Sequence, residues 1–159
     1  MMLETMSEPS RFQLPTVRAQ HTPVLLREVI EWLAPKPNMT IVDCTVGAGG
    51  HSAAIVPRLM PEGRLITMDC DEQALEAAKV RLVEFAPNVA YVHRNFRDLP
   101  NALAHLHGER VDGLLADLGM SSLQLDNPQR GLSFSREGPL DMRLDSRQPM
   151  TAASLIRQS

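Results

Sequence analysis

A glycine-rich turn between an apolar strand and a small-residue helix constrains the fold of this chain more than any other feature. Residues 40–42 have the pattern of a buried strand, and residues 52–56 are typical of the first turns of a helix. Between them lies the segment 43–51, which contains three glycines. Glycine at a strand-to-helix turn lets the backbone approach a flat ligand, because no side chain obstructs it. The turn therefore predicts an α/β fold that binds a nucleotide-like ligand.

Strand and helix patterns alternate along most of the chain. A first helix is expected to start with Thr22 as its N-cap and Pro23 at its first position. The remaining apolar runs predict strands at 40–43, 65–69, 89–93 and 111–117, and helices at 50–59, 72–85 and 99–106. This alternation predicts a parallel sheet with helices on both faces and with the carboxyl ends of all strands along one edge.

Polar or glycine residues follow each of the four predicted strands. They are the turn from Gly47 to His51, Asp69, the pair Asn95-Phe96, and Asp117. Ligands of open α/β sheets bind at this edge. Four independent strand ends with such residues are a stronger signal than any single motif, so the ligand site is expected there.

The residues around the turn distinguish between two classes of nucleotide. The turn lacks the third glycine of a dinucleotide fingerprint, while Asp69, about 20 residues further on, is placed to bind ribose hydroxyls. A pyrophosphate disfavours nearby carboxylates, yet Asp43, Asp71 and Asp117 all lie near strand ends. S-adenosylmethionine carries a sulfonium and an amino group, so the acidic edge favours it over NAD. A NAD site and a turn without any ligand remain alternatives.

Three residues near this edge allow a structural and a functional interpretation. His51 is either a polar residue at a helix start or a ligand contact. Phe96 either stacks on an adenine or belongs to the core. Asp117 lies where amino-group methyltransferases have an acid or amide that accepts hydrogen bonds from an exocyclic amine. The Pro-Pro-aromatic part of that motif is absent, so capping of the next turn is the alternative for Asp117.

No long periodic pattern follows Leu118, and Gly, Pro, Ser and charged residues dominate as far as Met150. A last short helix is expected at 152–157, capped by Thr151. Positive charge concentrates in this region in four arginines: Arg130, Arg136, Arg143 and Arg147. Together with Phe134 they could track phosphates and stack on unpaired bases. The alternative is a solvated loop in which they pair with nearby acids: Asp126, Asp141 and Asp145.

Composition excludes several classes of protein. The formal charge of −3 gives no global attraction to nucleic acid, so any such contact requires a local basic patch. Two cysteines without metal-ligand spacing fit a reducing compartment and predict no metal site. No apolar run approaches the ~20 residues that span a bilayer. Residues 1–20 have no signal-peptide core and are expected to form a flexible leader, which predicts a cytoplasmic protein.

The motifs together resemble one family, the bacterial small-subunit (16S) ribosomal RNA cytosine-N4 methyltransferases. The resemblance runs from about His21 to the last residue and rests on five segments: 21–26, 47–51, 117–126, 130–134 and 138–143. The last two are not general features of Rossmann-like methyltransferases. Departures are small and conservative: Val46 and Leu132 for Phe, Leu123 for Pro, Glu137 for Asp and Leu144 for Met.

The resemblance implies a Rossmann-like fold that uses S-adenosylmethionine, without a metal, to methylate the N4 amine of a cytosine in ribosomal RNA. It maps the cofactor contacts onto Gly49, Gly50, His51, Asp69, Phe96, Asp117 and Gln124, to which the turn adds Gly47. Asp117 is also the candidate catalytic residue that contacts the amine. Arg130, Phe134, Arg136 and Arg143 are the candidate RNA contacts. The expected partner is small-subunit ribosomal RNA or the assembled small subunit.

Family members are about twice as long, so the fold is expected to be incomplete at its C-terminus. Residues 21–126 would form the N-terminal part of the methyltransferase domain. Residues 127–159 would form a substrate-side loop and the start of a truncated helical insertion. The alternative function is a non-catalytic module that binds cofactor or RNA but transfers no methyl group.

Overall fold

A parallel four-stranded sheet forms the centre of the computed structural model, which describes residues 23–106 and 110–158. Its strands are β1 (Thr40–Asp43), β2 (Arg64–Asp69), β3 (Val89–His93) and β4 (Gly113–Leu115). They lie in the order β3-β2-β1-β4. Thr40 aligns with Arg64 on one side of β1, and Ile41 aligns with Gly113 on the other. β2 and β3 therefore lie on one side of β1 and β4 on the other, so the carboxyl ends of β1 and β4 lie side by side.

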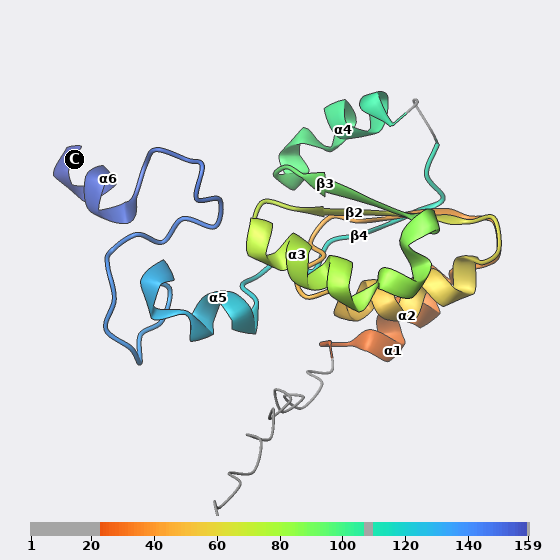
Figure 1. Cartoon of the computed structure of the whole chain (residues 1–159), viewed down its shortest axis with the longest axis horizontal. Coiled ribbons are helices and arrows are strands. Elements are labelled where there is room, and N and C mark those ends of the chain that lie inside the picture. The colour runs from red at the N-terminus through yellow and green to blue at the C-terminus, as the bar shows by residue number, and fades with distance from the viewer. Residues whose placement is uncertain (1–22, 107–109, 159) are drawn as a thin grey trace, which may run out of the picture.

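Helices cover both faces of the sheet, as the sequence predicts (Figure 1). α1 (Leu26–Leu33), α2 (Gly50–Leu59) and α3 (Glu72–Arg81) lie on one face, and α4 (Leu99–His105) lies on the other. Ile41 and Leu65 pack with Ile55 of α2 in a fully buried core on the first face. On the second face, Val42 and Met68 pack against Ala102 of α4. Apolar side chains on successive strand positions point to opposite faces, which explains two cores on one sheet.

Several element boundaries differ from the sequence prediction. α1 begins at Leu26 rather than at Pro23, because Leu25 has a left-handed backbone (φ 54°) that no helix continues through. Thr22 and the predicted leader, residues 1–20, lie outside the described residues. α3 ends at Arg81, and Val83–Asn88 forms 3₁₀ turns, since Pro87 lacks an amide donor and restricts the residue before it.

A short helix, α5 (Ser122–Asp126), lies in the stretch that the sequence predicts to be a loop. It follows Ser121, whose backbone amide donates to Oε1 of Gln124 at 3.0 Å. This bond is one half of a capping box, a signal that Ser121 and Gln124 carry in the sequence. A 3₁₀ turn at Pro128–Arg130 comes next, and the last helix is α6 (Ala152–Gln158).

Residues 118–158, the C-terminal segment, lie beside the carboxyl edge of the sheet (Figure 1). Two glycines hold the segment folded back on itself. A Cβ on Gly131 (φ 62°) would overlap the carbonyl oxygen of Pro139, and a Cβ on Gly138 would overlap that of Pro128. The Met142 amide also donates to the Arg130 carbonyl at 3.0 Å. The two family motifs in this region therefore pack on each other. The boundary expected between residues 126 and 127 stays a prediction.

Candidate cofactor and acceptor site

Asp43, the last residue of β1, fixes the shape of the glycine turn. Its carboxylate is buried and accepts hydrogen bonds from the Thr45 amide at 3.2 Å and the Ser52 hydroxyl at 2.7 Å. Burial raises the pKa of Asp43, and the two hydrogen bonds oppose that shift. This acid therefore joins the two ends of the turn, and its carboxylate does not face the ligand space.

Asp69, at the end of β2, lies directly beside the turn. Its Oδ2 accepts from the Gly47 amide at 3.0 Å and its Oδ1 from the Asp71 amide at 2.9 Å. Burial raises the pKa of Asp69, while these backbone hydrogen bonds lower it. A carboxylate has about four acceptor positions, and the backbone amides of Gly47, Cys70 and Asp71 account for three, which leaves room for a hydroxyl donor. The side chain is partly exposed and fits the predicted role of binding ribose.

The three glycines of the turn have different surroundings. A Cβ on Gly47 (φ 51°) would meet nothing closer than the Thr45 carbonyl oxygen at 4.0 Å, so this glycine faces open space. A Cβ on Gly49 would touch Ala78 of α3, and one on Gly50 would overlap the ring of Pro23. Gly47 thus leaves room for a ligand, whereas Gly49 and Gly50 permit close packing. The turn fits a nucleoside laid across Gly47.

His51 and Asp117 bring two acceptor atoms together. His51 is buried, and its Nε2 lies 3.0 Å from the Val24 carbonyl oxygen. A carbonyl only accepts hydrogen bonds, so Nε2 carries a proton in this contact, and Nδ1 is an acceptor whenever the ring is neutral. Nδ1 lies 3.8 Å from Oδ2 of Asp117, whose side chain is 53% exposed. The pair is suited to receive an N–H donor, such as an ammonium or an exocyclic amine.

Asp117 is oriented through its backbone, since its amide donates to the Thr45 hydroxyl at 2.7 Å. That bond ties the end of β4 to the glycine turn and leaves the Asp117 carboxylate directed to the exposed edge. Phe96 follows β3 in the 3₁₀ turn Phe96–Asp98 and is 48% exposed, so it lies outside the core. Exposure at this edge favours the stacking interpretation of Phe96.

Gln124 and Arg130 both contact Asp71, one of the acids near strand ends, and the sequence predicted neither contact. Asp71 caps α3 by accepting from the Gln73 amide at 3.1 Å. In addition, its Oδ2 accepts a hydrogen bond from Nε2 of Gln124 at 3.0 Å and forms an ion pair with Nη1 of Arg130, also at 3.0 Å. Each of these contacts spans more than 50 residues of sequence, and no local pattern signals them.

The other arginines of the C-terminal segment pair with acids, as the alternative interpretation expects. Arg136 contacts Asp126, and Arg147 contacts Asp145. Arg143 binds both carboxylate oxygens of Asp141, at 2.7 and 2.8 Å, and these bonds lower the pKa of Asp141 to about 2. Phe134, in contrast, is fully exposed. Direct RNA contact by Arg130, Phe134, Arg136 and Arg143 stays a prediction.

The described residues were also searched for metal and membrane features. In residues 23–106 and 110–158, no group of three or more His, Cys, Asp or Glu side chains could hold a metal ion. No helix in the same part of the chain is long and apolar enough to cross a membrane.

Comparison with known proteins decides the family. A model of the MraW methylase family matches residues 18–159. The chain belongs to this family. The predicted family and the predicted Rossmann-like methyltransferase fold are thereby confirmed.

Two relatives of the chain within this family are named ribosomal RNA small subunit methyltransferase H. The protein of Symbiobacterium thermophilum is 47% identical over 138 residues, which are 87% of this chain and 43% of the relative. That of Sorangium cellulosum is 50% identical over 139 residues, 87% of this chain and 44% of the relative. The chain spans less than half the length of these relatives.

Among solved structures, the chain is similar to the C-terminal domain of precorrin-6Y C5,15-methyltransferase from Rhodobacter capsulatus. The match has a TM-score of 0.50 at 21% identity, and it covers 62% of this chain and 50% of that one. At this identity the likeness shows the fold alone.

Proposed function

We propose that this chain carries the cofactor site and part of the acceptor site of an S-adenosylmethionine-dependent methyltransferase that acts on the N4 amine of a cytosine in small-subunit ribosomal RNA. The observation that carries the proposal is the carboxyl edge, where open backbone at Gly47 lies beside the free acceptor positions of Asp69 and Asp117. Membership of the MraW methylase family and the names of the relatives support the acceptor.

S-adenosylmethionine would supply an electrophilic methyl group, and the residues of the edge match its parts. Asp69 would accept from the ribose hydroxyls, and Phe96 would stack on the adenine. The acceptor pair of His51 and Asp117 would receive the ammonium. Gly49 and Gly50 would shape the turn, and Gln124 would close the site from the side of α5.

Asp117 would contribute to the reaction by orienting the acceptor. Its exposed carboxylate can accept a hydrogen bond from an exocyclic amine and so direct the nitrogen lone pair. An amine proton is lost readily once the nitrogen becomes cationic, so no strong base is required of the protein. Catalysis would then come mainly from positioning, which can supply about 7 kcal/mol or more of rate acceleration.

The C-terminal segment would contact the RNA. Phe134 is fully exposed and free to stack on an unpaired base. Arg136, half exposed beside Asp126, could exchange that weak surface pair for a phosphate. Arg130 and Arg143 have their guanidinium groups engaged within the segment and would support its shape. The proposed partner is small-subunit ribosomal RNA or the assembled subunit, and the proposed location of the activity is the cytoplasm.

Calorimetric titration of the chain with S-adenosylmethionine, its demethylated product and NAD tests the cofactor. We expect saturable binding of the first two and none of NAD. Binding of NAD with no response to the other two would refute the proposal.

Transfer of labelled methyl groups to unmethylated small subunits tests the reaction. If the wild-type chain labels a cytosine and Asp117→Ala does not, the result would support the proposed role of Asp117 in orienting the acceptor amine. Cofactor binding without transfer would support the alternative function, a binding module, for the 159-residue chain.

A further inference from the structure

A buried polar cluster joins the cofactor edge to the C-terminal segment. Its members are Asp71, Gln124 and Arg130, which we call the Asp71 joint. The side chains of Asp71 and Arg130 are 5% and 13% exposed, and Gln124 is buried as well. Gln124 donates a hydrogen bond to Oδ2 of Asp71, and Arg130 forms an ion pair with the same oxygen. Asp71 therefore has a charged partner and an amide partner from a region more than 50 residues away.

On one side, the joint is linked to the proposed ribose-binding acid. The Asp71 amide donates to Oδ1 of Asp69, and the other oxygen of Asp69 accepts from the Gly47 amide. The turn after β2 thus holds Asp69 and Asp71 in fixed relation. A change in the orientation of the Asp69 carboxylate would therefore alter its hydrogen bond with the Asp71 amide.

On the other side, the joint is linked to the folded-back part of the segment. Nη2 of Arg130 donates to the carbonyl oxygens of Arg143 and Leu144, at 3.1 and 2.7 Å. The Arg130 carbonyl accepts from the Met142 amide at 3.0 Å. The guanidinium of Arg130 therefore bridges Asp71 to the carbonyls of Arg143 and Leu144, and its planar geometry orients these contacts.

Burial of a charged pair is a poor way to gain stability but an effective way to fix an orientation. Removing one partner of such a pair leaves an unpaired buried charge. An apolar contact in the same place would also hold the two regions together, but it would not select one relative orientation. Asp71 is not among the predicted cofactor or RNA contacts, whereas Gln124 is a predicted cofactor contact and Arg130 a predicted RNA contact. The bonds of the joint run from the cofactor side to the acceptor side.

We infer that Asp71 and Arg130 are positioning residues that hold the C-terminal segment in register with the cofactor edge and couple cofactor occupancy to the order of that segment. The coupling rests on the proposed function, whereas the positioning does not. Coupling between two sites is reciprocal. If bound cofactor favours the ordered segment by a given factor, loss of that order must lower the affinity for the cofactor by the same factor.

Hydrogen exchange of the full chain without cofactor tests the positioning. Arg130→Gln should speed exchange of the amides at 141–144 by about tenfold or more, because their carbonyl anchors are lost. Arg130→Lys should resemble Arg130→Gln, since one ammonium cannot reproduce the planar geometry. Rescue by lysine would show that charge alone matters and would overturn the inference.

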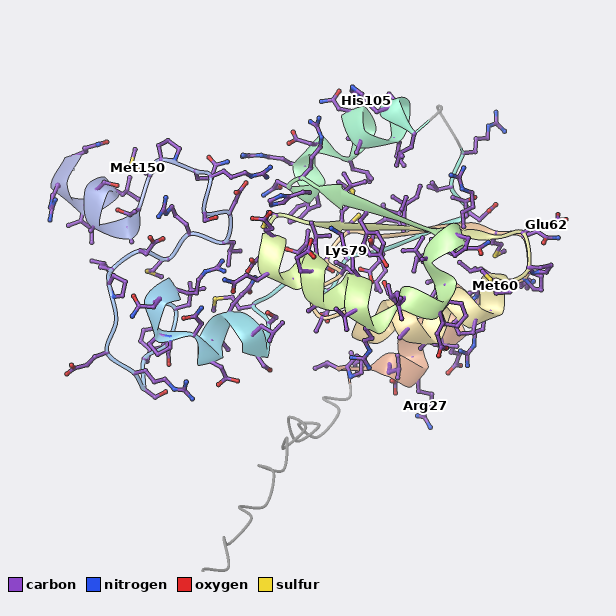
Figure 2. The ribbon with its side chains drawn as sticks, in the orientation of Figure 1. Arg27, Met60, Glu62, Lys79, His105 and Met150 are labelled. Carbon is purple, nitrogen blue, oxygen red and sulfur yellow. The ribbon has the colours of Figure 1, made fainter. Side chains whose placement is uncertain are left out.

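Lys79→Gln is the matched control. Lys79 lies on α3, the helix that Asp71 caps, and pairs with Glu76 at the surface (Figure 2). Its replacement should leave exchange at 141–144 unchanged. If Arg130→Gln does not fold, the double variant Asp71→Asn with Arg130→Gln removes both charges together. Exchange as slow as in the wild type in that double variant would also overturn the inference.

The same measurement with S-adenosylmethionine tests the coupling. In the wild type the cofactor should slow exchange at 141–144, and in Arg130→Gln it should bind more weakly and no longer do so. Binding that leaves exchange unchanged in the wild type would overturn the coupling alone. No binding to the wild type would overturn the proposed function and the coupling with it, while the cofactor-free comparison still decides the positioning.

Discussion

Gly47, Gly49 and Gly50 obey different constraints although they lie in one turn. Gly49 and Gly50 exist because α3 and Pro23 pack against the backbone there. Gly47 (φ 51°) has open space around it, so packing does not require its lack of a side chain, and the proposed ligand would lie there. A substitution at Gly47 can therefore separate binding from folding.

We predict that Gly47→Ala folds but binds S-adenosylmethionine at least about tenfold more weakly. The left-handed backbone costs alanine roughly 1–2 kcal/mol, which a domain tolerates, while the added methyl group enters the ligand space. Thermal denaturation and calorimetry measure the two effects. Gly50→Ala is the contrasting variant, with a larger loss of stability from the overlap with Pro23. Unchanged affinity in Gly47→Ala would place the ligand elsewhere.

At the scale of elements, the junction of β1 and α2 depends on the protonation of Asp43. Burial raises the pKa of this acid, so the folded chain keeps the proton at pH values where the unfolded chain has lost it. The contribution to stability is therefore present at low pH and is lost as pH rises from about 4 through the folded pKa.

We predict that Asp43→Asn flattens the pH dependence of the free energy of unfolding in that window, because asparagine does not titrate. Ser52→Ala should steepen it, since the hydroxyl bond that lowers the pKa is removed. Urea unfolding at a series of pH values from 4 to 8 gives the slopes. Equal slopes in the wild type and Asp43→Asn would show that Asp43 does not contribute.

Elements with a strong local pattern could be predicted from the sequence. β1 and β3 have the bounds that their apolar runs predict. α5 was missed because five residues give no periodicity, although Ser121 and Gln124 carry a capping signal. The parallel strands alone predict which residues meet at the carboxyl edge.

The contacts of the C-terminal segment could not be predicted in this way. Arg130 contacts a buried acid that lies three α-helices earlier in the sequence, and this contact depends on how the segment folds back. The overlap of Gly131 and Gly138 with opposing carbonyls is likewise a product of the tertiary fold. Resemblance to the family identified these motifs as important but did not show that they pack on each other.

At the scale of the whole molecule, β4 has one hydrogen-bonded neighbour among the described strands, β1. Leu114 of this strand is 48% exposed, and Leu118 and Met120, just beyond it, are 68% and 51% exposed. An edge strand with apolar side chains at and beyond it is a template for association with another chain.

We predict that the 159-residue chain self-associates through this edge and that Leu114→Lys reduces the association. The substitution should change stability by about 0.5 kcal/mol at most, because the side chain is half exposed. Light scattering over a concentration series measures the mass. Trp32→Lys, at an exposed site on α1, is the control and should leave association unchanged. Equal masses for Leu114→Lys and the wild type would exclude the edge as the interface.

The order of the strands also has a consequence for synthesis on the ribosome. β1 lies in the middle of the sheet, but its partner on one side arrives late, since Thr40 and Asp112 at the start of the β1–β4 pair are 72 residues apart. At about 5–20 residues per second, the growing chain presents one open side of β1 for roughly 4–14 seconds. During that interval the open side of β1 is available to pair with a strand of another chain.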